Sequence, residues 1–279
     1  MSGDPRITPL KDGLASRALE GLARARRYMD PERLAVAVPA AAIRSRPDPA
    51  AEQVDQALYG EAFDVLDRRG GIAWGQARRD GYVGYVALSD LGGRAATPTH
   101  RVAAIRTYAF ARPDIKSPAT GPYSLNALVA GQAREGRFVQ GADGGWFVAG
   151  HLAPVGTFET DYVTVAERHL GAAYLWGGRE SHGLDCSGLV LQALLACGRA
   201  GPRDTDQQMR MGRAADPSAL RRGDLVFWRG HVAIMLDAER IVHANAHHMA
   251  VAAEPLAEAV ARIAGAGSGE PTAYRRIGS

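Results

Sequence analysis

The spacing of apolar positions divides the chain into an N-terminal arm, two β-rich stretches and a mixed C-terminal stretch. Residues 12–29 carry apolar side chains at helical spacing, which predicts a helix within an N-terminal arm of residues 1–31. Residues 32–94 show short period-two runs separated by glycine-rich turns, which predicts a small β-barrel domain. Residues 95–156 repeat this pattern in weaker form, and residues 157–279 change to helices followed by strands. The predicted fold class is therefore α+β, with a C-terminal domain behind two small barrels.

The two β-rich stretches are predicted to be related barrels in tandem. The strand-like runs of the first are Leu34–Val38, Ala62–Asp67, Ile72–Ala77 and Tyr82–Val86. Those of the second are Val102–Ile105, Tyr108–Phe110, Asn126–Val129, Arg137–Gln140 and Gly145–Val148. The last run of each stretch has a similar aromatic and glycine pattern, which indicates a repeated unit.

The C-terminal stretch has helices first and an antiparallel sheet afterwards. The predicted helices are Thr160–Leu170, an apolar helix that ends near Cys197, Thr205–Met211 and Pro255–Ile263. The predicted strands are Asp224–Trp228, His231–Leu236, Arg240–Ala244 and Thr272–Ile277.

Cys186 stands at an unusual place for a structural cysteine. Asp185 is the expected N-cap of the apolar helix, and Cys186 opens its first turn. Unpaired N–H groups and the positive end of the helix dipole favour an anion there, so a lowered thiol pKa and a nucleophilic role are expected. Cys197 lies on the same helix, about 16 Å away, which excludes a disulfide between them and indicates core packing.

Two histidines on successive predicted strands complete a candidate catalytic group. His231 opens one strand and His243 ends the next, so an antiparallel hairpin would bring them to the same end. His231 is then the base for Cys186, and His243 orients it as a third residue. N–H groups at the start of the helix are the expected oxyanion hole. Cysteine followed by two histidines in this order is a papain-like arrangement.

Composition and charge exclude several other classes. The chain has 279 residues, 33 Lys and Arg against 30 Asp and Glu, and a net charge of +3 with the arginines scattered. A nucleic-acid-binding protein would concentrate its positive charge, so no such partner is expected. His182, His243, His247 and His248 lack accompanying ligand spacing, so neither a metal nor a cofactor is expected.

The sequence has no apolar run typical of a signal peptide or a membrane span. Two cysteines form no disulfide framework. A cytoplasmic protein without a membrane partner is therefore expected, while the oligomeric state stays open.

Five ordered motifs in residues 160–279 resemble the NlpC-type cell-wall cysteine peptidases. They are Tyr174–Gly178, Asp185–Val190, Arg222–Trp228, His231–Ile234 and Ile241–Ala244. The resemblance implies a papain-like domain that cleaves peptidoglycan stem peptides, with Cys186, His231 and His243 as the catalytic residues. It also places Tyr174 in the substrate pocket.

The upstream barrels resemble bacterial SH3 domains, and two of them before an NlpC-type domain is the layout of the dipeptidyl-peptidase VI branch. This branch cuts the γ-D-glutamyl–L-diamino acid bond of peptides with a free N-terminal L-Ala, the diamino acid being diaminopimelate or Lys, and the expected role is murein recycling. An alternative is a D,L-endopeptidase acting on intact wall, with the barrels as wall-binding modules. The further substrate-binding residues that the resemblance implies are Asp185, Ser187, Thr205, Glu61 and Tyr82, with Tyr85 as the alternative to Tyr82.

For two of these residues a purely structural role is open as well: Glu61 capping a turn, and Tyr82 packing in a barrel core. A buried carboxylate pair, Asp185 and Glu61, would bind an ammonium group and reject a blocked N-terminus.

Overall fold

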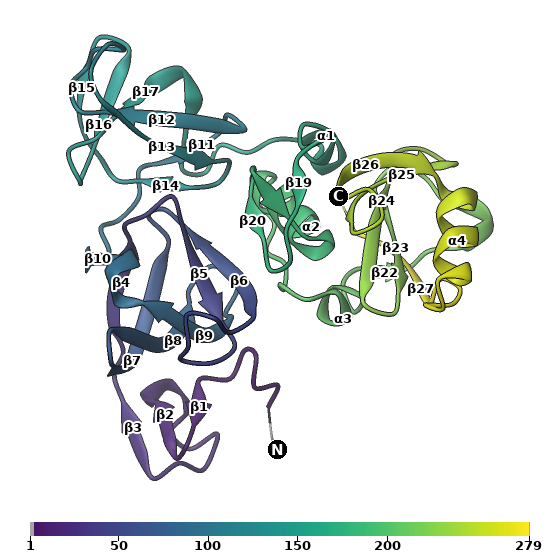
Figure 1. Cartoon of the computed structure of the whole chain (residues 1–279), viewed down its shortest axis with the longest axis horizontal. Helices are drawn as coiled ribbons and strands as arrows, with labels where there is room; N and C mark the ends of the chain where they lie inside the picture. The colour runs from purple at the N-terminus through teal and green to yellow at the C-terminus, as the bar shows by residue number, and fades with distance from the viewer. Residues whose placement is uncertain (1–2, 279) are drawn as a thin grey trace. The chain divides into compact units, whose positions relative to one another are not determined.

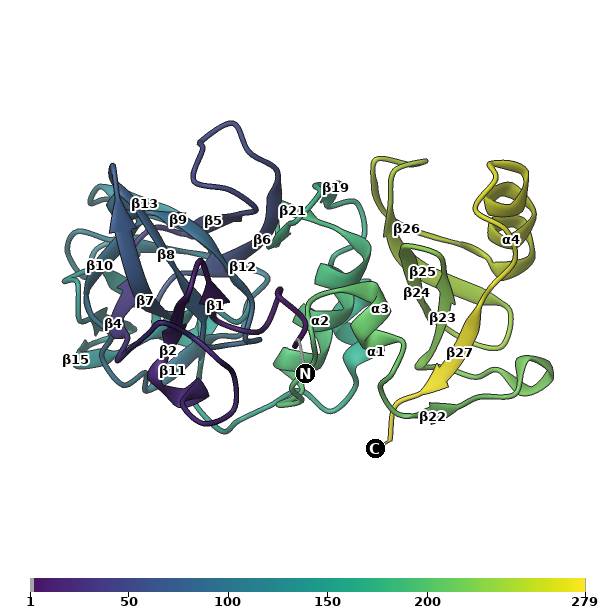
Figure 2. The ribbon, with the colours of Figure 1, turned by 90° about the horizontal axis from the view of Figure 1, so that it is seen from below.

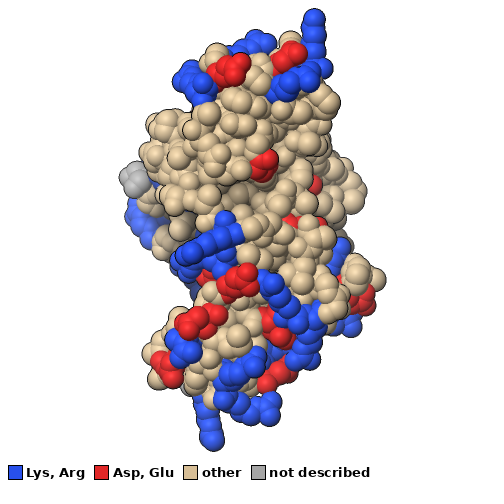
Figure 3. Space-filling view, turned by 90° about the vertical axis from the view of Figure 1, so that its left-hand side faces the viewer, with Lys and Arg blue, Asp and Glu red and all other residues tan. Residues whose placement is uncertain are grey.

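The computed structural model describes residues 3–278 and divides into two compact units, residues 1–155 and 156–279 (Figure 1). The first unit is built almost entirely from strands, and the second combines helices with a long sheet. Among the described residues, no helix combines the length and apolar character needed to cross a membrane. On the face of the molecule drawn in Figure 3, basic and acidic side chains lie next to one another.

The N-terminal arm is not the predicted helix. It forms a small three-stranded sheet from β1 (Leu10–Lys11), β2 (Leu14–Ser16) and β3 (Arg27–Met29), with one 3-10 turn, η1 (Arg17–Leu19). The helix prediction is wrong because the backbone at Asp12 and Gly13 has φ of 52° and 80°. These values end any right-handed helix and turn β1 back onto β2.

The first barrel is one seven-stranded sheet with the strand order β10-β4-β7-β8-β9-β5-β6. Its elements are β4 (Glu32–Val36), β5 (Ala40–Arg44), β6 (Gln53–Leu58), β7 (Ala62–Arg69), β8 (Ile72–Ala77), β9 (Val83–Ala87), η2 (Leu88–Asp90) and β10 (Leu91–Arg94). Alternating residues such as Ile43, Phe63 and Val86 are buried and form its core.

The second β module has two sheets, ordered β14-β11-β18 and β13-β12-β17-β16-β15. Its elements are β11 (His100–Val102), β12 (Arg106–Phe110), β13 (Ala119–Ser124), β14 (Leu128–Val129), β15 (Gly131–Glu135), β16 (Phe138–Gly141), β17 (Trp146–Val148), η3 (Ala149–His151) and β18 (Leu152–Pro154). Tyr59 from the first barrel packs with Tyr123 and Phe147 in its core. Within the first unit, the two modules therefore share buried apolar contacts.

The second unit has a nine-stranded sheet with helices on both sides. The strand order is β20-β21-β19-β26-β25-β24-β23-β27-β22. Its strands are β19 (Ala173–Tyr174), β20 (Arg179–Glu180), β21 (Gly183–Leu184), β22 (Arg213–Ala214), β23 (Asp224–Trp228), β24 (His231–Met235), β25 (Arg240–Asn245), β26 (Ala250–Pro255) and β27 (Ala273–Arg276). Its helices are α1 (Tyr162–Glu167), α2 (Cys186–Ala196), α3 (Thr205–Gln208), η4 (Pro217–Ala219) and α4 (Leu256–Gly265).

Helices α2 and α4 cover opposite sides of strands β23–β26 (Figures 1 and 2). Helix α2 is buried along its whole length and packs with α1, whereas α4 buries only one stripe, which includes Ala259. This explains why α2 reads as a continuous apolar run and α4 as an amphipathic one. The buried helix carries the candidate nucleophile at its first position.

Candidate active site

The start of helix α2 is held by a glycine-lined loop. A Cβ at Gly178 would lie 2.4 Å from the Gly183 carbonyl oxygen, and one at Gly188 would lie 2.2 Å from the Gly178 carbonyl oxygen. No side chain fits at either position, so the two glycines allow the loop to lie directly against the first turn of the helix. This close approach brings the loop amides to the Asp185 side chain.

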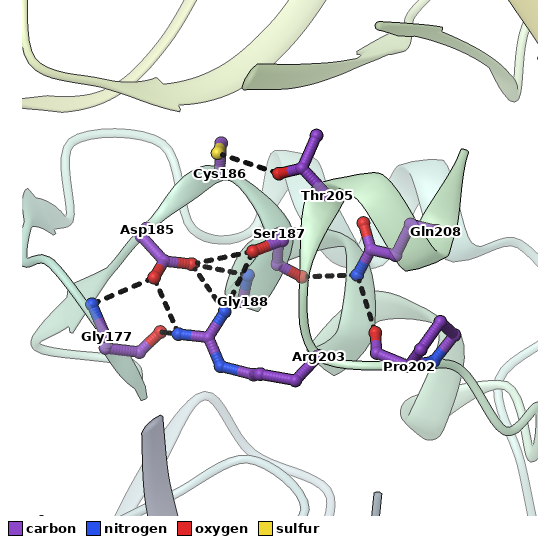
Figure 4. Close-up of polar contacts among 10 residues, drawn as sticks. Gly177, Asp185, Cys186, Ser187, Gly188, Pro202, Arg203, Thr205 and Gln208 are labelled. Carbon is purple, nitrogen blue, oxygen red and sulfur yellow. Dashed lines mark hydrogen bonds and ion pairs between the residues drawn. The ribbon is translucent and has the colours of Figure 1, made fainter. Parts of the chain in front are cut away.

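Asp185 caps helix α2 and also anchors the loop (Figure 4). Its carboxylate accepts the Gly188 N–H at 2.7 Å and the Gly177 N–H at 2.9 Å. Arg203, itself buried, donates to both carboxylate oxygens at 2.9 and 2.6 Å, which makes a bidentate ion pair. The carboxylate is therefore fully occupied by groups of the second unit, and its predicted role as a substrate ligand stays a prediction.

Ser187 and Gln208 extend this polar layer under the nucleophile (Figure 4). The Ser187 hydroxyl accepts from Arg203 at 2.8 Å and donates to Asp185 at 3.3 Å. The Gln208 amide donates to the Ser187 and Pro202 carbonyl oxygens, each at 2.9 Å, and so ties α3 to α2. Ser187 is buried, and in this structure its hydroxyl contacts protein groups.

The Cys186 thiol lies between α3 and the start of β24. Its Sγ is 3.7 Å from the Thr205 hydroxyl, and the backbone of Val232, the residue after His231, helps to stabilise the thiolate form. Burial, and after it the Asp185 charge, raises the pKa of Cys186 to about 11, while the Thr205 and Val232 hydrogen bonds act in the opposite direction. The expected lowering of the thiol pKa by the helix terminus is thus wrong, because burial outweighs it.

The sheet register brings the two predicted histidines together. Strands β24 and β25 are antiparallel, with Ile234 opposite Val242. In this register His243 is opposite the residue that lies two positions after His231 in β24. The side chains of the two histidines therefore lie on the same face of the sheet. His231 Nε2 lies 2.8 Å from His243 Nδ1, with ring centroids 5.0 Å apart.

Both imidazoles are held in their uncharged form. Burial lowers the pKa of His231 to about 4; the Arg262 cation adds to this shift and Asp185 opposes it. Burial also lowers the pKa of His243 to about 2. The repulsion that His231 and Arg262 exert on its charged form adds to this shift. At neutral pH the site therefore contains a thiol and neutral imidazoles. A neutral imidazole can accept the proton of a thiol as the sulfur attacks.

Tyr174 and Thr205 also lie near the thiol. Tyr174 is in β19, and burial, followed by the charges of Cys186 and Asp185, raises the pKa of its phenol, which therefore stays protonated. Thr205 opens α3. Their predicted roles in substrate binding stay predictions.

Glu61 and Tyr82 belong to the first unit. The Glu61 carboxylate is buried, accepts the Leu58 N–H at 3.0 Å and lies 3.7 Å from the Arg79 guanidinium. Tyr82 packs in the core of the first barrel and is 5% exposed. These contacts match the structural alternatives, turn capping and core packing, and the substrate-binding roles of both residues stay predictions. Tyr85 accepts a hydrogen bond from Lys11, whose ammonium lies 4.6 Å from the Tyr85 ring centroid.

One group of three potential metal ligands is found among the described residues. The ligand atoms of His243, His248 and Glu254 lie within 4.8 Å of one another. However, both ring nitrogens of His243 already bond protein groups: Nδ1 to His231 and Nε2 to Glu254 at 2.7 Å. A metal would therefore have to break one of the bonds that orient His231.

Sequence reasoning missed Arg203, Gln208 and Glu254. Arg203 directly precedes the Asp204–Thr205 pair, but nothing in the pattern shows that its side chain turns inward to Asp185. Glu254 was missed because the alanine-rich β26 was not predicted as a strand, and alanine has little β propensity. The signal that could have identified Glu254 is that it is the single charged residue in the otherwise apolar run of β26.

Comparisons with known proteins bear on the domains and the fold of the chain. Residues 171–262 match the NlpC/P60 family, and residues 43–91 match the bacterial dipeptidyl-peptidase Sh3 domain. The C-terminal unit is an NlpC/P60 domain. The chain therefore combines an SH3-like domain with an NlpC/P60 domain of papain-like fold, as the motifs predicted.

Curated relatives match parts of the chain. It is 32% identical over 104 residues to the gamma-D-glutamyl-L-lysine dipeptidyl-peptidase of Bacillus cereus, covering 34% of this chain and 31% of the relative. Over 81 residues it is 38% identical to the murein DD-endopeptidase MepS/murein LD-carboxypeptidase of Escherichia coli. This match covers 27% of this chain and 43% of that relative. The matches thus span less than half the length of these relatives.

Among solved structures, an NlpC/P60 family protein from Bacillus cereus superposes with a TM-score of 0.76 at 20% identity, covering 88% of this chain and 99% of that one. At this identity the match shows the fold alone. It extends over both units and so supports the α+β architecture of SH3-like modules followed by the NlpC/P60 domain.

Proposed function

We propose that this chain is a cysteine peptidase that hydrolyses the γ-D-glutamyl–L-diamino acid bond of peptidoglycan stem peptides. Its substrates are short peptides with a free N-terminal L-Ala and diaminopimelate or Lys at the third position, and its role is murein recycling in the cytoplasm. The carrying observation is the Cys186 thiol at the start of α2, 3.7 Å from the Thr205 hydroxyl, in the same unit as the hydrogen-bonded His231–His243 pair. The similarity to gamma-D-glutamyl-L-lysine dipeptidyl-peptidases supports this choice of bond.

In the acylation step, Cys186 Sγ attacks the γ-carbonyl carbon of D-Glu while its proton passes to His231. The C–N bond then breaks, the proton moves from His231 to the departing amine of the diamino acid, and a thioester remains on Cys186. Because the resting thiol and imidazole are both uncharged, proton transfer accompanies the attack and no thiolate has to form in advance.

In the second step, water attacks the thioester carbon while His231 accepts its proton. The C–S bond then breaks, L-Ala-γ-D-Glu leaves as the free acid, and the proton passes from His231 to the sulfur, which restores the thiol. The oxyanion of each intermediate needs donors at the start of α2. Asp185 accepts the Gly188 N–H with its side chain and the Leu189 N–H with its carbonyl oxygen. We assign the Cys186 N–H, at the nucleophile itself, to the oxyanion.

The test compares four substrates with the full chain: the tripeptide with diaminopimelate, the same peptide with Lys, its N-acetylated form, and whole sacculi. Mass spectrometry should show release of L-Ala-γ-D-Glu from the free tripeptides and much slower cleavage of the N-acetylated one. Cys186→Ala should abolish cleavage, whereas Cys197→Ala, which removes the other thiol of the same helix, should not. Cleavage that persists in the Cys186 variant would disprove the proposal.

The second candidate function is D,L-endopeptidase action on intact wall, with the SH3-like modules as wall-binding units. The similarity to a murein DD-endopeptidase favours it. Soluble peptides released from sacculi, with equal rates on free and N-acetylated tripeptides, would select this candidate instead. Fractionation of cells that express the tagged chain tests the cytoplasmic location.

A further inference from the structure

A line of polar side chains crosses three neighbouring strands behind the candidate nucleophile. His231 is in β24, His243 in β25 and Glu254 in β26, and these strands are adjacent in the sheet. In the β25–β26 ladder, His243 is opposite Ala252 and Ile241 is opposite Glu254, so His243 and Glu254 are diagonal neighbours on one face. The His231 Nε2–His243 Nδ1 distance is 2.8 Å and the His243 Nε2–Glu254 Oε1 distance is 2.7 Å.

The Glu254 carboxylate at the end of this line determines which ring nitrogens of His243 and His231 carry a proton. An ionised carboxylate only accepts hydrogen bonds, so His243 must carry its proton on Nε2 and donate it to Glu254. In neutral His243, Nδ1 is then an acceptor, and His231 must donate to it from Nε2. The lone pair of His231 is thereby left on Nδ1, the nitrogen that can take a proton from a thiol.

Arg262 holds the carboxylate in place. This residue is in α4, the helix that directly follows β26, and its guanidinium bonds the same Oε1 atom of Glu254. The Glu254 side chain is 10% exposed, so a lone negative charge there would be costly and the ion pair offsets that cost. With its charge compensated, Glu254 acts on His243 chiefly as a fixed acceptor.

We propose that Glu254, held by Arg262, is a positioning residue that sets the tautomers of His243 and His231 and so makes His231 Nδ1 the proton acceptor. This inference rests on the proposed cysteine-peptidase function and extends the Cys186–His231–His243 group by one carboxylate and one cation. It assigns a part in the chemistry to α4, which lies on the opposite side of the sheet from the nucleophile helix (Figure 2).

Charges near the histidines determine the pH signature of this arrangement. His231 is influenced by Asp185 and Arg262, and His243 by His231, Arg262, His247 and His248, besides its bond to Glu254. Removing the Glu254 charge leaves the Arg262 cation unopposed, which disfavours the imidazolium form of His231. Removing Arg262 has the opposite effect, because the carboxylate then stabilises that form.

The experiment measures kcat/KM against pH on the free tripeptide for Glu254→Gln, Arg262→Gln and a matched control, Glu258→Gln. Glu258 is an exposed glutamate in the first turn of the same helix. Glu254→Gln should lower kcat by on the order of 10- to 100-fold with little change in KM. A glutamine can either donate or accept here, so it fixes neither tautomer.

The acid limb of the profile gives the sharper readout. It should move to lower pH in Glu254→Gln and to higher pH in Arg262→Gln, by roughly half a unit each. Ionisation of the substrate is common to all variants and cancels in the comparison. A merely structural role would lower activity without opposite shifts, so shifts in the same direction, or an unchanged kcat in both variants, overturn the proposal. If Glu254→Gln does not fold, the sign of the Arg262→Gln shift decides.

A second measurement does not depend on the substrate. Spectra of the 15N-histidine-labelled chain, with signals assigned by single histidine replacements, should show His231 and His243 protonated on Nε2 and not on Nδ1. Glu254→Gln should give mixed tautomers, and Glu258→Gln should match the unchanged chain. Unchanged tautomers in Glu254→Gln overturn the positioning role even when the peptide is cleaved. Mixed tautomers without any peptide cleavage support it while contradicting the proposed substrate.

Discussion

Arg203 and Asp185 form a buried bidentate ion pair directly beneath the nucleophile, with nitrogen–oxygen distances of 2.9 and 2.6 Å. The Arg203 side chain is 1% exposed. This pair joins the segment before α3 to the N-cap of α2, so the position of Cys186 depends on a contact between segments 18 residues apart.

Arg203→Met should therefore destabilise the protein strongly. It leaves the Asp185 carboxylate buried without its cation, for which a loss of about 3–5 kcal/mol in the free energy of unfolding is typical. Urea denaturation measures the loss, and Arg210→Met, at an exposed arginine near α3, should change stability by less than about 0.5 kcal/mol. Equal effects of the two substitutions would contradict a structural role for the pair.

The raised pKa of Cys186 predicts how fast its thiol reacts with iodoacetamide at different pH values. With a pKa of about 11 for the thiol, the thiolate fraction and hence the alkylation rate should rise steadily from neutral pH toward pH 11. The Cys197→Ala background leaves Cys186 as the single cysteine. A rate plateau between pH 5 and 9 would instead indicate a resting thiolate–imidazolium pair.

The lowered pKa of His231 predicts a loss of stability in acid. The unfolded chain takes up this proton near pH 6.5, whereas the folded protein resists until about pH 4, so stability is full above 6.5 and falls as the pH drops through this window. The loss is roughly 3 kcal/mol. His231→Gln should flatten this pH dependence, whereas His182→Gln, at an exposed histidine, should preserve it.

Thr205 should matter through its hydroxyl. That group lies 3.7 Å from Sγ and its hydrogen bond lowers the pKa of the Cys186 thiol. Thr205→Val removes the bond at nearly constant volume and should reduce kcat/KM by about 10-fold. Thr205→Ser keeps the hydroxyl and serves as the control. A valine variant as active as the serine variant would show that the contact is not used.

The sequence allowed the C-terminal domain to be predicted well because its chemistry and its periodicity coincide. The strands around His231 and His243 are apolar, short and bounded by turns, and α2 is a continuous apolar run with an aspartate cap. The arm before residue 32 was predicted wrongly because its apolar spacing also fits a helix. The left-handed backbone at Asp12, Gly13 and Gly21 is incompatible with one.

The polar support of the site was harder to foresee. Whether Arg203 turns inward, or Glu254 reaches His243, depends on contacts between segments that are distant in sequence or belong to a strand with weak β propensity. The direction of the Cys186 pKa shift depends on burial, which no motif reports. Residue type and spacing thus predict the candidate reacting groups, while the directions of their pKa shifts follow only from packing.

The buried, protonated state of Cys186 also affects how the protein withstands oxidants. Peroxide reacts with thiolates far faster than with thiols, and accessible thiolates are the ones converted to sulfenic and then irreversibly to sulfinic acid. Cys186 is 6% exposed and burial raises the pKa of its thiol to about 11, so the thiol should largely avoid this chemistry. The packing that raises the pKa of the thiol should thus also help to keep the sulfur reduced.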